Sequence, residues 1–360
     1  MVWSRGGGGR EAIEPFLLDP SVSEIMVNGP GPVWVERFGR LEATGTILDA
    51  ETIELLIEQV VAPLGRRIDR SSPMVDARLA DGSRLNAVVP PVAVDGPYVT
   101  IRRFSVRPVP LEDFAPPGVA AALRWAVAAR CNLVVSGGAG AGKTTLLNAL
   151  AESIAPGERV VTVEDAAELA LASDHVVRLE ARPADSDGVT PVSIRQLVRN
   201  ALRMRPDRII VGEVRGAETL DMLQAMNTGH EGSLSTCHAN SPADAISRLE
   251  TMVLLDGGAV PLAAVREQIV AAIDMVVHVS RRSQGRRCIT SVAVIDRSDD
   301  RGDGSRPRLH RIADEHGLNS LPALAPRVPD ASAPDWGWLD LKADRSLPDA
   351  SAPDWGWLEQ

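Results

Sequence analysis

The chain has 360 residues, 44% of them hydrophobic, so it is long and apolar enough to bury the cores of two domains. Its formal net charge of −10 and its aromatic content of 3% disfavour a nucleic-acid-binding surface, which needs a basic patch and stacking rings. No apolar run reaches the roughly 18 residues of a membrane-spanning helix, and the first residues lack the apolar core of a signal peptide. We therefore expect a globular cytoplasmic protein that binds no nucleic acid stably.

Residues 11–107 combine short apolar strands with one helix, which predicts a small N-terminal α/β domain. Glycine and proline alternate over residues 29–32, which predicts a turn between the first two strands. The strands are expected at Ile25–Asn28, Val33–Glu36, Arg84–Val89 and Val99–Arg103, and the helix at Glu51–Val61. Four prolines within residues 108–117 interrupt regular structure, which predicts an interdomain linker.

Residues 118–298 alternate strand and helix patterns, which predicts a second α/β domain with a mostly parallel sheet covered by helices. Ser241 and Pro242 form an N-cap and first-turn pair for one of these helices. Strands are expected at Leu133–Ser136, Val160–Val163, Val176–Leu179, Ile209–Gly212, Ser233–Thr236, Met275–Ser280 and Ile289–Ile295. Helices are expected at Thr144–Ser153, Ser193–Met204, Ala217–Met226, Pro242–Val253 and Pro261–Ala272.

Residues 299–360 are rich in Asp, Arg, Gly and Pro and predict a disordered acidic tail. Within this tail the eleven residues of Pro329–Leu339 occur again as Pro348–Leu358, and each copy carries two tryptophans. Exposed tryptophans in a disordered segment suggest a motif that docks on an unknown partner. A duplication in an unselected tail explains the same pattern, and both interpretations stay open.

The strongest motif is Gly137–Thr144, which fits the phosphate-binding pattern GxxxxGK[ST] between a predicted strand and a predicted helix. Lys143 is one of only two lysines in the chain, and we expect it to neutralise the β- and γ-phosphates. We expect Thr144 to be a Mg²⁺ ligand and Thr145, the next residue, to contact the nucleotide. The backbone N–H groups that are expected to cradle the phosphates belong to Gly138, Ala139, Gly140, Ala141 and Gly142.

Acidic residues follow two of the predicted strands. Glu213 comes directly after Ile209–Gly212, and the carboxyl ends of parallel strands open on the ligand crevice, so we expect Glu213 to organise the metal. Glu164 and Glu168 follow Val160–Val163, and one of them is expected to position the attacking water. An ordinary surface acid, or an acid pair that caps a helix, is the alternative interpretation.

His230 and His238 lie on either side of the Ser233–Thr236 strand. A role in sensing the γ-phosphate or a neighbouring subunit is one interpretation, and a hydrogen-bonded turn histidine is the other. Zinc is disfavoured because no other His or Cys shows ligand spacing around them.

Together these stretches resemble the secretion ATPases of the GspE superfamily, whose four boxes correspond here to Gly137–Thr144, Glu164–Glu168, Ile209–Glu213 and Gly229–Asn240. Further stretches resemble the CpaF/TadA branch, which serves Tad-type pili and related secretion or conjugation machines. These stretches are Leu18–Gly29, Asp81–Arg84 and Leu202–Arg208. The CxxC pairs typical of type II secretion members are missing from the chain.

The resemblance implies a RecA-like P-loop domain in a homohexameric ring that uses ATP and Mg²⁺ at the cytoplasmic face of the inner membrane, against a platform protein. It makes Arg84, Arg102 and Arg103 candidates to reach the γ-phosphate, and it places Arg203 and Arg205 near the neighbouring subunit. Two other functions stay open. One is a RecA-like DNA translocase, and the other is a nucleotide-binding switch that hydrolyses weakly.

Overall fold

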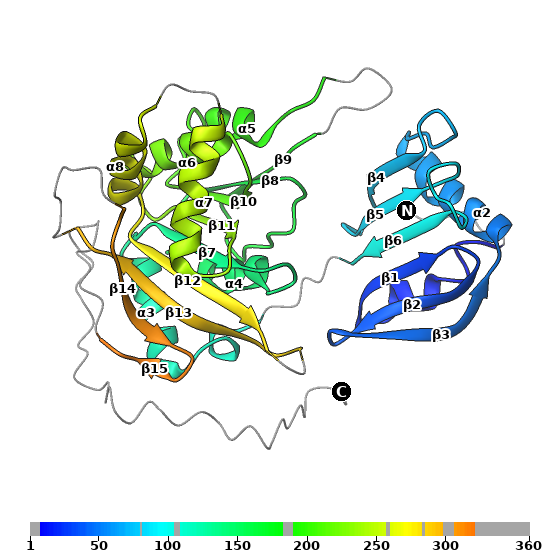
Figure 1. The fold of residues 1–360 in the computed structure, drawn as a ribbon, viewed down its shortest axis with the longest axis horizontal. Coiled ribbons are helices and arrows are strands. Elements are labelled where there is room, and N and C mark those ends of the chain that lie inside the picture. Colours follow the sequence, from blue (N-terminus) through cyan, green and yellow to red (C-terminus); the bar gives the residue numbers. More distant parts are fainter. Residues whose placement is uncertain are drawn as a thin grey trace. The chain divides into compact units, whose positions relative to one another are not determined.

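The computed structural model describes residues 8–79, 81–103, 109–182, 190–256, 260–282, 285–297 and 306–320. These residues form two compact units, one made mainly of the residues up to 107 and one made mainly of those from 108 on (Figure 1). The α/β fold class expected from the sequence is confirmed. No helix in the described ranges is long and apolar enough to cross a membrane. The duplicated eleven-residue motif lies outside the described residues.

The first unit is an antiparallel sheet of six strands in the order β3-β2-β1-β6-β5-β4. Its strands are β1 (Val22–Asn28), β2 (Gly31–Arg37), β3 (Arg40–Leu48), β4 (Met74–Arg78), β5 (Arg84–Val88) and β6 (Tyr98–Arg102). Its helices are α1 (Glu14–Leu18), α2 (Ala50–Val61) and the short 3-10 helix η1 (Ala62–Leu64). The sequence patterns did not predict α1, β3 or β4.

Alternation along the strands builds the core of this unit. Ile25 and Val27 of β1 and Val35 of β2 are buried and belong to the same apolar cluster as Leu56 and Ile57 of α2. Every second side chain of a strand points to the same face, so the sheet presents one apolar face to the helix. α2 begins after Asp49, whose side chain accepts a hydrogen bond from the Thr52 amide at 2.8 Å and thereby caps the helix.

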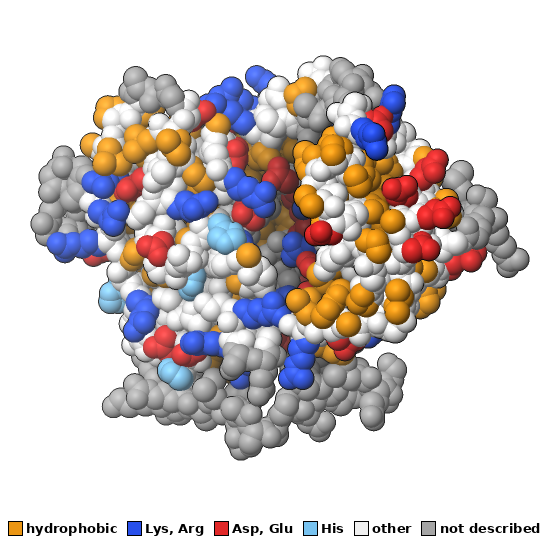
Figure 2. All heavy atoms as spheres, turned by 45° about the vertical axis from the view of Figure 1, so that its right-hand side comes forward, with side chains coloured by type: hydrophobic (Ala, Val, Ile, Leu, Met, Phe, Trp, Pro, Cys, Tyr) orange, Lys and Arg blue, Asp and Glu red, His pale blue; other side chains and the backbone are white. Residues whose placement is uncertain are grey.

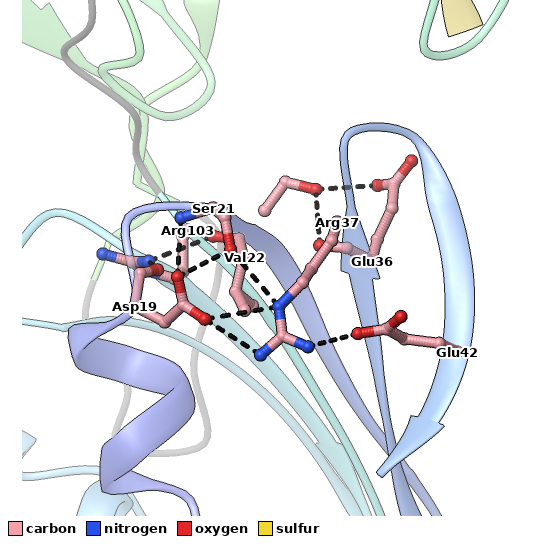
Figure 3. A network of polar contacts seen from close by, with 8 residues as sticks. Asp19, Ser21, Val22, Glu36, Arg37, Glu42 and Arg103 are labelled. Atoms are coloured by element: carbon pink, nitrogen blue, oxygen red, sulfur yellow. Dashed lines mark hydrogen bonds and ion pairs between the residues drawn. The ribbon is translucent and has the colours of Figure 1, made fainter. Parts of the chain in front are cut away.

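A polar network around Asp19 joins the end of α1 to β1, β2 and the end of β6 (Figure 3). Arg37 Nη2 donates to Asp19 Oδ2 at 2.9 Å, and hydrogen bonds from Ser21 and Arg37 lower the pKa of Asp19. Arg103 Nη1 donates to the carbonyl oxygens of Asp19 and Val22, the second at 3.0 Å. The guanidinium of Arg103 therefore holds its own unit together.

The second unit is a sheet of nine strands in the order β15-β14-β13-β12-β7-β11-β10-β8-β9. The six strands from β12 to β9 run parallel, and β13, β14 and β15 are antiparallel additions. The strands are β7 (Leu133–Gly137), β8 (Val160–Glu164), β9 (Val176–Glu180), β10 (Arg208–Val214), β11 (Leu234–His238), β12 (Met275–Arg281), β13 (Arg287–Ile295), β14 (Leu309–Asp314) and β15 (Gly317–Leu318).

Helices cover both faces of this sheet. Leu133 and Val135 of β7 pack in a cluster with helices α3 and α4, whereas Val134 between them packs in the cluster of α5 to α8. Successive side chains of a strand point to opposite faces, so the two clusters are two separate cores. The helices are α3 (Pro117–Ala128), α4 (Lys143–Ala151), α5 (Ile194–Ala201), α6 (Glu218–Asn227), α7 (Pro242–Leu255) and α8 (Leu262–Ala272), with the short 3-10 helix η2 (Leu111–Asp113).

Two expectations about this unit are corrected. The predicted linker at 108–117 is in part core, because Leu111 and Phe114 are buried in the cluster beneath α3 and α4. The predicted end of the ordered domain at 298 was too early, because β14 pairs with β13 and buries Ile312 and Ala313. Pro116 and Pro117 begin α3 rather than mark a free connection.

Arg208 at the start of β10 is fully buried and anchors the amino edge of the parallel strands. Its Nε and Nη2 donate to the carboxylate of Glu158 at 2.7 and 2.9 Å, and its Nη1 donates to the Val127 carbonyl at 2.7 Å. A Cβ on Gly232 would lie 2.6 Å from that same Nη1, so the guanidinium needs glycine beside it. A buried charge with these partners is a structural element of the fold.

Candidate nucleotide-binding site

The phosphate-binding motif folds as the sequence predicts, with β7 ending at Gly137 and α4 beginning at Lys143. A Cβ on Gly137 would lie 2.5 Å from the carbonyl oxygen of Val279, so glycine at this position leaves room for the backbone of the neighbouring strand β12. Gly142 has a φ of +95°, in the left-handed region that favours glycine, and it caps α4. The loop therefore turns directly into the first turn of α4.

Lys143 is buried beneath this loop, and its Nζ donates to the carbonyl oxygen of Gly138 at 3.2 Å. A buried ammonium next to the N-terminus of a helix is a position where a phosphate group is stabilised, because the lysine charge and the helix dipole act together. Ala141 is buried, whereas Ala139 and Gly140 at the loop tip are exposed, and Thr144 and Thr145 are half-buried.

Four strands bring their functional residues to one edge of the sheet. His238 at the end of β11 pairs in register with Gly137 at the end of β7, and Val214 of β10 pairs with Cys237 of β11. Glu164 is the last residue of β8, whose Val163 pairs with Val211 of β10. Because these strands are parallel, Lys143, Glu164, Glu213 and His238 all lie at the carboxyl edge, where ligands bind in open α/β sheets.

Glu213 is the acid that lies among the cations of this edge. Its Oε1 accepts from Arg215 Nε at 3.1 Å and lies 4.0 Å from Nδ1 of His238. Burial alone would raise the pKa of Glu213, but the hydrogen bond from Arg215 and the charge of Lys143 outweigh it and lower the pKa. Glu213 is therefore a carboxylate at neutral pH, as a metal-organising residue must be.

His238 is kept neutral by the same surroundings. Burial and then the positive charge of Lys143 lower the pKa of His238, and Glu213 only partly opposes them. A neutral imidazole can donate and accept a proton at its two nitrogens, so His238 is suited to hydrogen-bond a phosphate oxygen or a water.

Glu164 is buried and lies beside the glycine of the next strand. A Cβ on Gly212 would lie 2.9 Å from Cγ of Glu164, so this side chain fills the space that glycine leaves. Its Oε2 accepts from the amides of Glu168 and Leu169, both at 2.8 Å, while Oε1 is buried with no hydrogen-bond partner among the described residues. Burial raises the pKa of Glu164 to about 7, against those two hydrogen bonds.

Glu168 lies in the irregular connection after β8, outside any helix. Its backbone amide holds Glu164, and its own side chain is half-buried. Of the two acids predicted to position a water, Glu164 has the free acceptor oxygen and the pKa near neutrality that general base chemistry requires.

The edge fits a magnesium nucleotide. Thr144 and Glu213 would supply the hydroxyl and carboxylate oxygens that Mg²⁺ prefers, and phosphates and water would supply its remaining ligands. Gly140 and Gly142 adopt left-handed backbone conformations of the kind that form anion cradles, and Oε1 of Glu164, which has no hydrogen-bond partner among the described residues, could accept from a water.

Other predicted residues lie elsewhere. His230 precedes β11 and therefore lies at the amino edge, at the opposite end of the strand from His238, and its Nδ1 is buried without a hydrogen-bond partner in the described part of the chain. Arg203 and Arg205 are exposed and precede β10, so they too lie at the amino edge, away from Lys143 of the same chain. The structure thus does not bring these three residues to the phosphate loop.

The three N-terminal arginines belong to the first unit. Arg84 of β5 and Arg102 of β6 are paired in register and exposed, and Arg102 Nε lies 3.5 Å from Oε1 of Glu24. Arg103 donates to backbone carbonyl oxygens, as described above.

Sequence reasoning missed Arg215, which joins two acids of the site. Besides its contact with Glu213, its Nη1 lies 3.3 Å from Oδ2 of Asp165, the residue after β8. The signal was available, because Arg215 lies two residues after Glu213 and so on the same side of an extended chain. The face in Figure 2 shows Lys and Arg side chains in separate groups, with Asp and Glu side chains between some of them.

Comparison with known proteins places the chain in a family. The family described as type II/IV secretion system protein matches residues 8–306. A putative conjugal transfer protein of Mycobacterium tuberculosis (strain H37Rv) is 41% identical over 305 residues, which cover 81% of this chain and 86% of that protein. The type IV secretion system protein PtlH of Bordetella pertussis is 37% identical over 309 residues, with 77% and 91% covered.

The fold is shared with a solved structure. The crystal structure of the pilus retraction motor PilT with bound ADP has a TM-score of 0.59 at 21% identity and covers 80% of this chain and 82% of that chain. Since the family match spans most of the sequence, the chain belongs to the type II/IV secretion system protein family.

Proposed function

We propose that this protein is a Mg²⁺-dependent ATPase that couples ATP hydrolysis to macromolecular export or pilus assembly. One observation supports this proposal best. Four residues lie at the carboxyl edge of one parallel sheet, namely Lys143, Glu164, Glu213 and His238. Its relatives include conjugal transfer and type IV secretion proteins, which supports a role in such a machine.

Each residue has a distinct role in this proposal. Lys143 and the amides at the start of α4 bind the phosphates, and Thr144 and Glu213 hold Mg²⁺, which neutralises charge on the β- and γ-phosphates. Glu164 accepts a proton from the attacking water through Oε1, and His238 hydrogen-bonds the terminal phosphate. Arg215 holds Glu213 in place.

The wider assignment extends the same proposal. The motifs Leu18–Gly29, Asp81–Arg84 and Leu202–Arg208 favour the CpaF/TadA branch and hence a Tad-type pilus or a related conjugation or secretion machine. We propose a homohexameric ring at the cytoplasmic face of the membrane, held by an inner-membrane platform protein. The resemblance further implies Arg84, Arg102 and Arg103 as candidates to reach the γ-phosphate.

Steady-state phosphate release tests the enzymatic proposal. Lys143→Ala removes the charge that binds the phosphates, so turnover with Mg²⁺ and ATP should fall at least about a hundredfold while the protein stays folded. The matched control is Lys342→Ala, which removes the other lysine of the chain and should leave turnover unchanged. Undiminished hydrolysis by the Lys143→Ala protein would contradict the assignment, and stimulation by added DNA would favour a translocase.

A further inference from the structure

Two arginines of the β12–β13 hairpin lie against the phosphate loop. Arg281 ends β12, Arg287 begins β13, and the two are paired directly in the antiparallel register. A Cβ on Gly142 would lie 2.7 Å from Cδ of Arg287, and one on Gly140 would lie 3.8 Å from Nη1 of Arg281. The hairpin thus adds two cations to the loop that already holds Lys143.

Arg287 reaches the first turn of α4. Its Nη1 donates to Oγ1 of Thr145 at 3.4 Å, so the guanidinium lies within one helical turn of Lys143. Positive charges at the N-terminus of a helix are destabilised by the helix dipole and by one another. A phosphate bound between them would offset both the repulsion between the cations and their unfavourable interaction with the dipole. A guanidinium can also donate two parallel N–H groups to phosphate oxygens.

The position of Arg287 indicates which phosphates it meets. In phosphate loops the amides at the start of the helix cradle the α- and β-phosphates, and the loop lysine reaches the β- and γ-phosphates. Arg287 packs on Gly142 and Thr145, at the helix start, and not at the loop tip. We propose that Arg287, supported by Arg281, is a nucleotide-binding residue that contacts the α- and β-phosphates, an inference that rests on the proposed function.

Equilibrium binding of ADP and ATP with Mg²⁺ tests this inference. Arg287→Ala should weaken both nucleotides by the same factor, about tenfold or more, because the lost contact is to phosphates that both carry. Arg287→Lys keeps the charge but loses the planar fork and should recover only part of the affinity. Arg281→Ala should show a smaller loss for both nucleotides.

Arg286→Ala is the matched control, because Arg286 is the arginine directly before Arg287 and, like Arg287, is exposed, and its affinities should equal those of the wild type. Melting temperatures of all variants verify that they are folded. Wild-type affinities in Arg287→Ala would overturn the inference, and so would a loss confined to ATP, which would move the contact to the γ-phosphate. If the wild-type protein itself binds neither nucleotide, the proposed function fails with it, and the two failures are thereby distinguished.

Discussion

Glu164 combines two properties that are rarely found in one carboxyl group of a folded protein. It is buried at the end of a strand, and one of its oxygens has no hydrogen-bond partner in the described residues. Desolvation raises its pKa to about 7, so it exchanges its proton in the range where a general base works best. Burial thus destabilises the charged form of Glu164, and a carboxyl group of this kind is typical of a catalytic position.

This acid makes stability depend on pH. Between the ordinary Glu pKa of 4.5 and about 7, the folded protein holds a proton that the unfolded chain has lost. The free energy of unfolding should therefore fall as the pH rises through this window, by about 3 kcal/mol at most. Glu164→Gln should flatten the curve in urea titrations at pH 5 to 7.5. An unchanged slope in the variant would show that Glu164 is not the group responsible.

Single residues also set the limit of prediction from sequence. Lys143 and Glu213 were assigned correctly to one edge because a motif and a strand end locate them. The structural roles of Arg208 and Arg103 could not be predicted, because their partners are backbone carbonyls and an acid that lie far away along the chain. A charge that is buried by tertiary contacts leaves no local pattern.

At the scale of elements, the central parallel strands were the most predictable part, because β7, β8 and β10 are largely apolar runs that end near a polar residue. Ser241 caps α7 as expected, accepting from the Asp244 amide at 3.0 Å. β14 was missed because it buries only Ile312 and Ala313, which are adjacent, so it shows no alternation. β3 and β4 expose most of their side chains and gave a similarly weak signal.

The packing between the neighbouring strands β8 and β10 depends on glycine at position 212. Gly212→Ala would place a methyl group 2.9 Å from Cγ of Glu164, so Glu164 must shift. We expect a loss of about 1–3 kcal/mol in stability and a drop in turnover larger than the drop in ATP affinity. Gly216→Ala is the control, since its methyl group meets only Glu218 at an ordinary 3.6 Å. Equal turnover in the two variants would contradict this packing argument.

At the scale of the whole molecule, the proposed ring makes a prediction about two arginines at the amino edge of the sheet. Arg203 and Arg205 are exposed at the edge opposite Lys143, so they cannot serve the site of their own chain. If they serve a neighbouring subunit, the double Arg203→Ala, Arg205→Ala variant should lower turnover several-fold and keep the affinity for ATP. Sedimentation with ATP should give the mass of six chains for the wild type. A monomer that hydrolyses ATP at the full rate would contradict the ring.

The most direct test is calorimetric titration of the full chain with ATP and Mg²⁺, using Glu164→Gln so that bound nucleotide is not consumed. A site built from Lys143 and the start of α4 predicts saturable binding of one ATP per chain, which Lys143→Ala abolishes and Lys342→Ala leaves intact. Absence of any ATP binding by the folded Glu164→Gln protein, or undiminished binding after Lys143→Ala, would contradict the account.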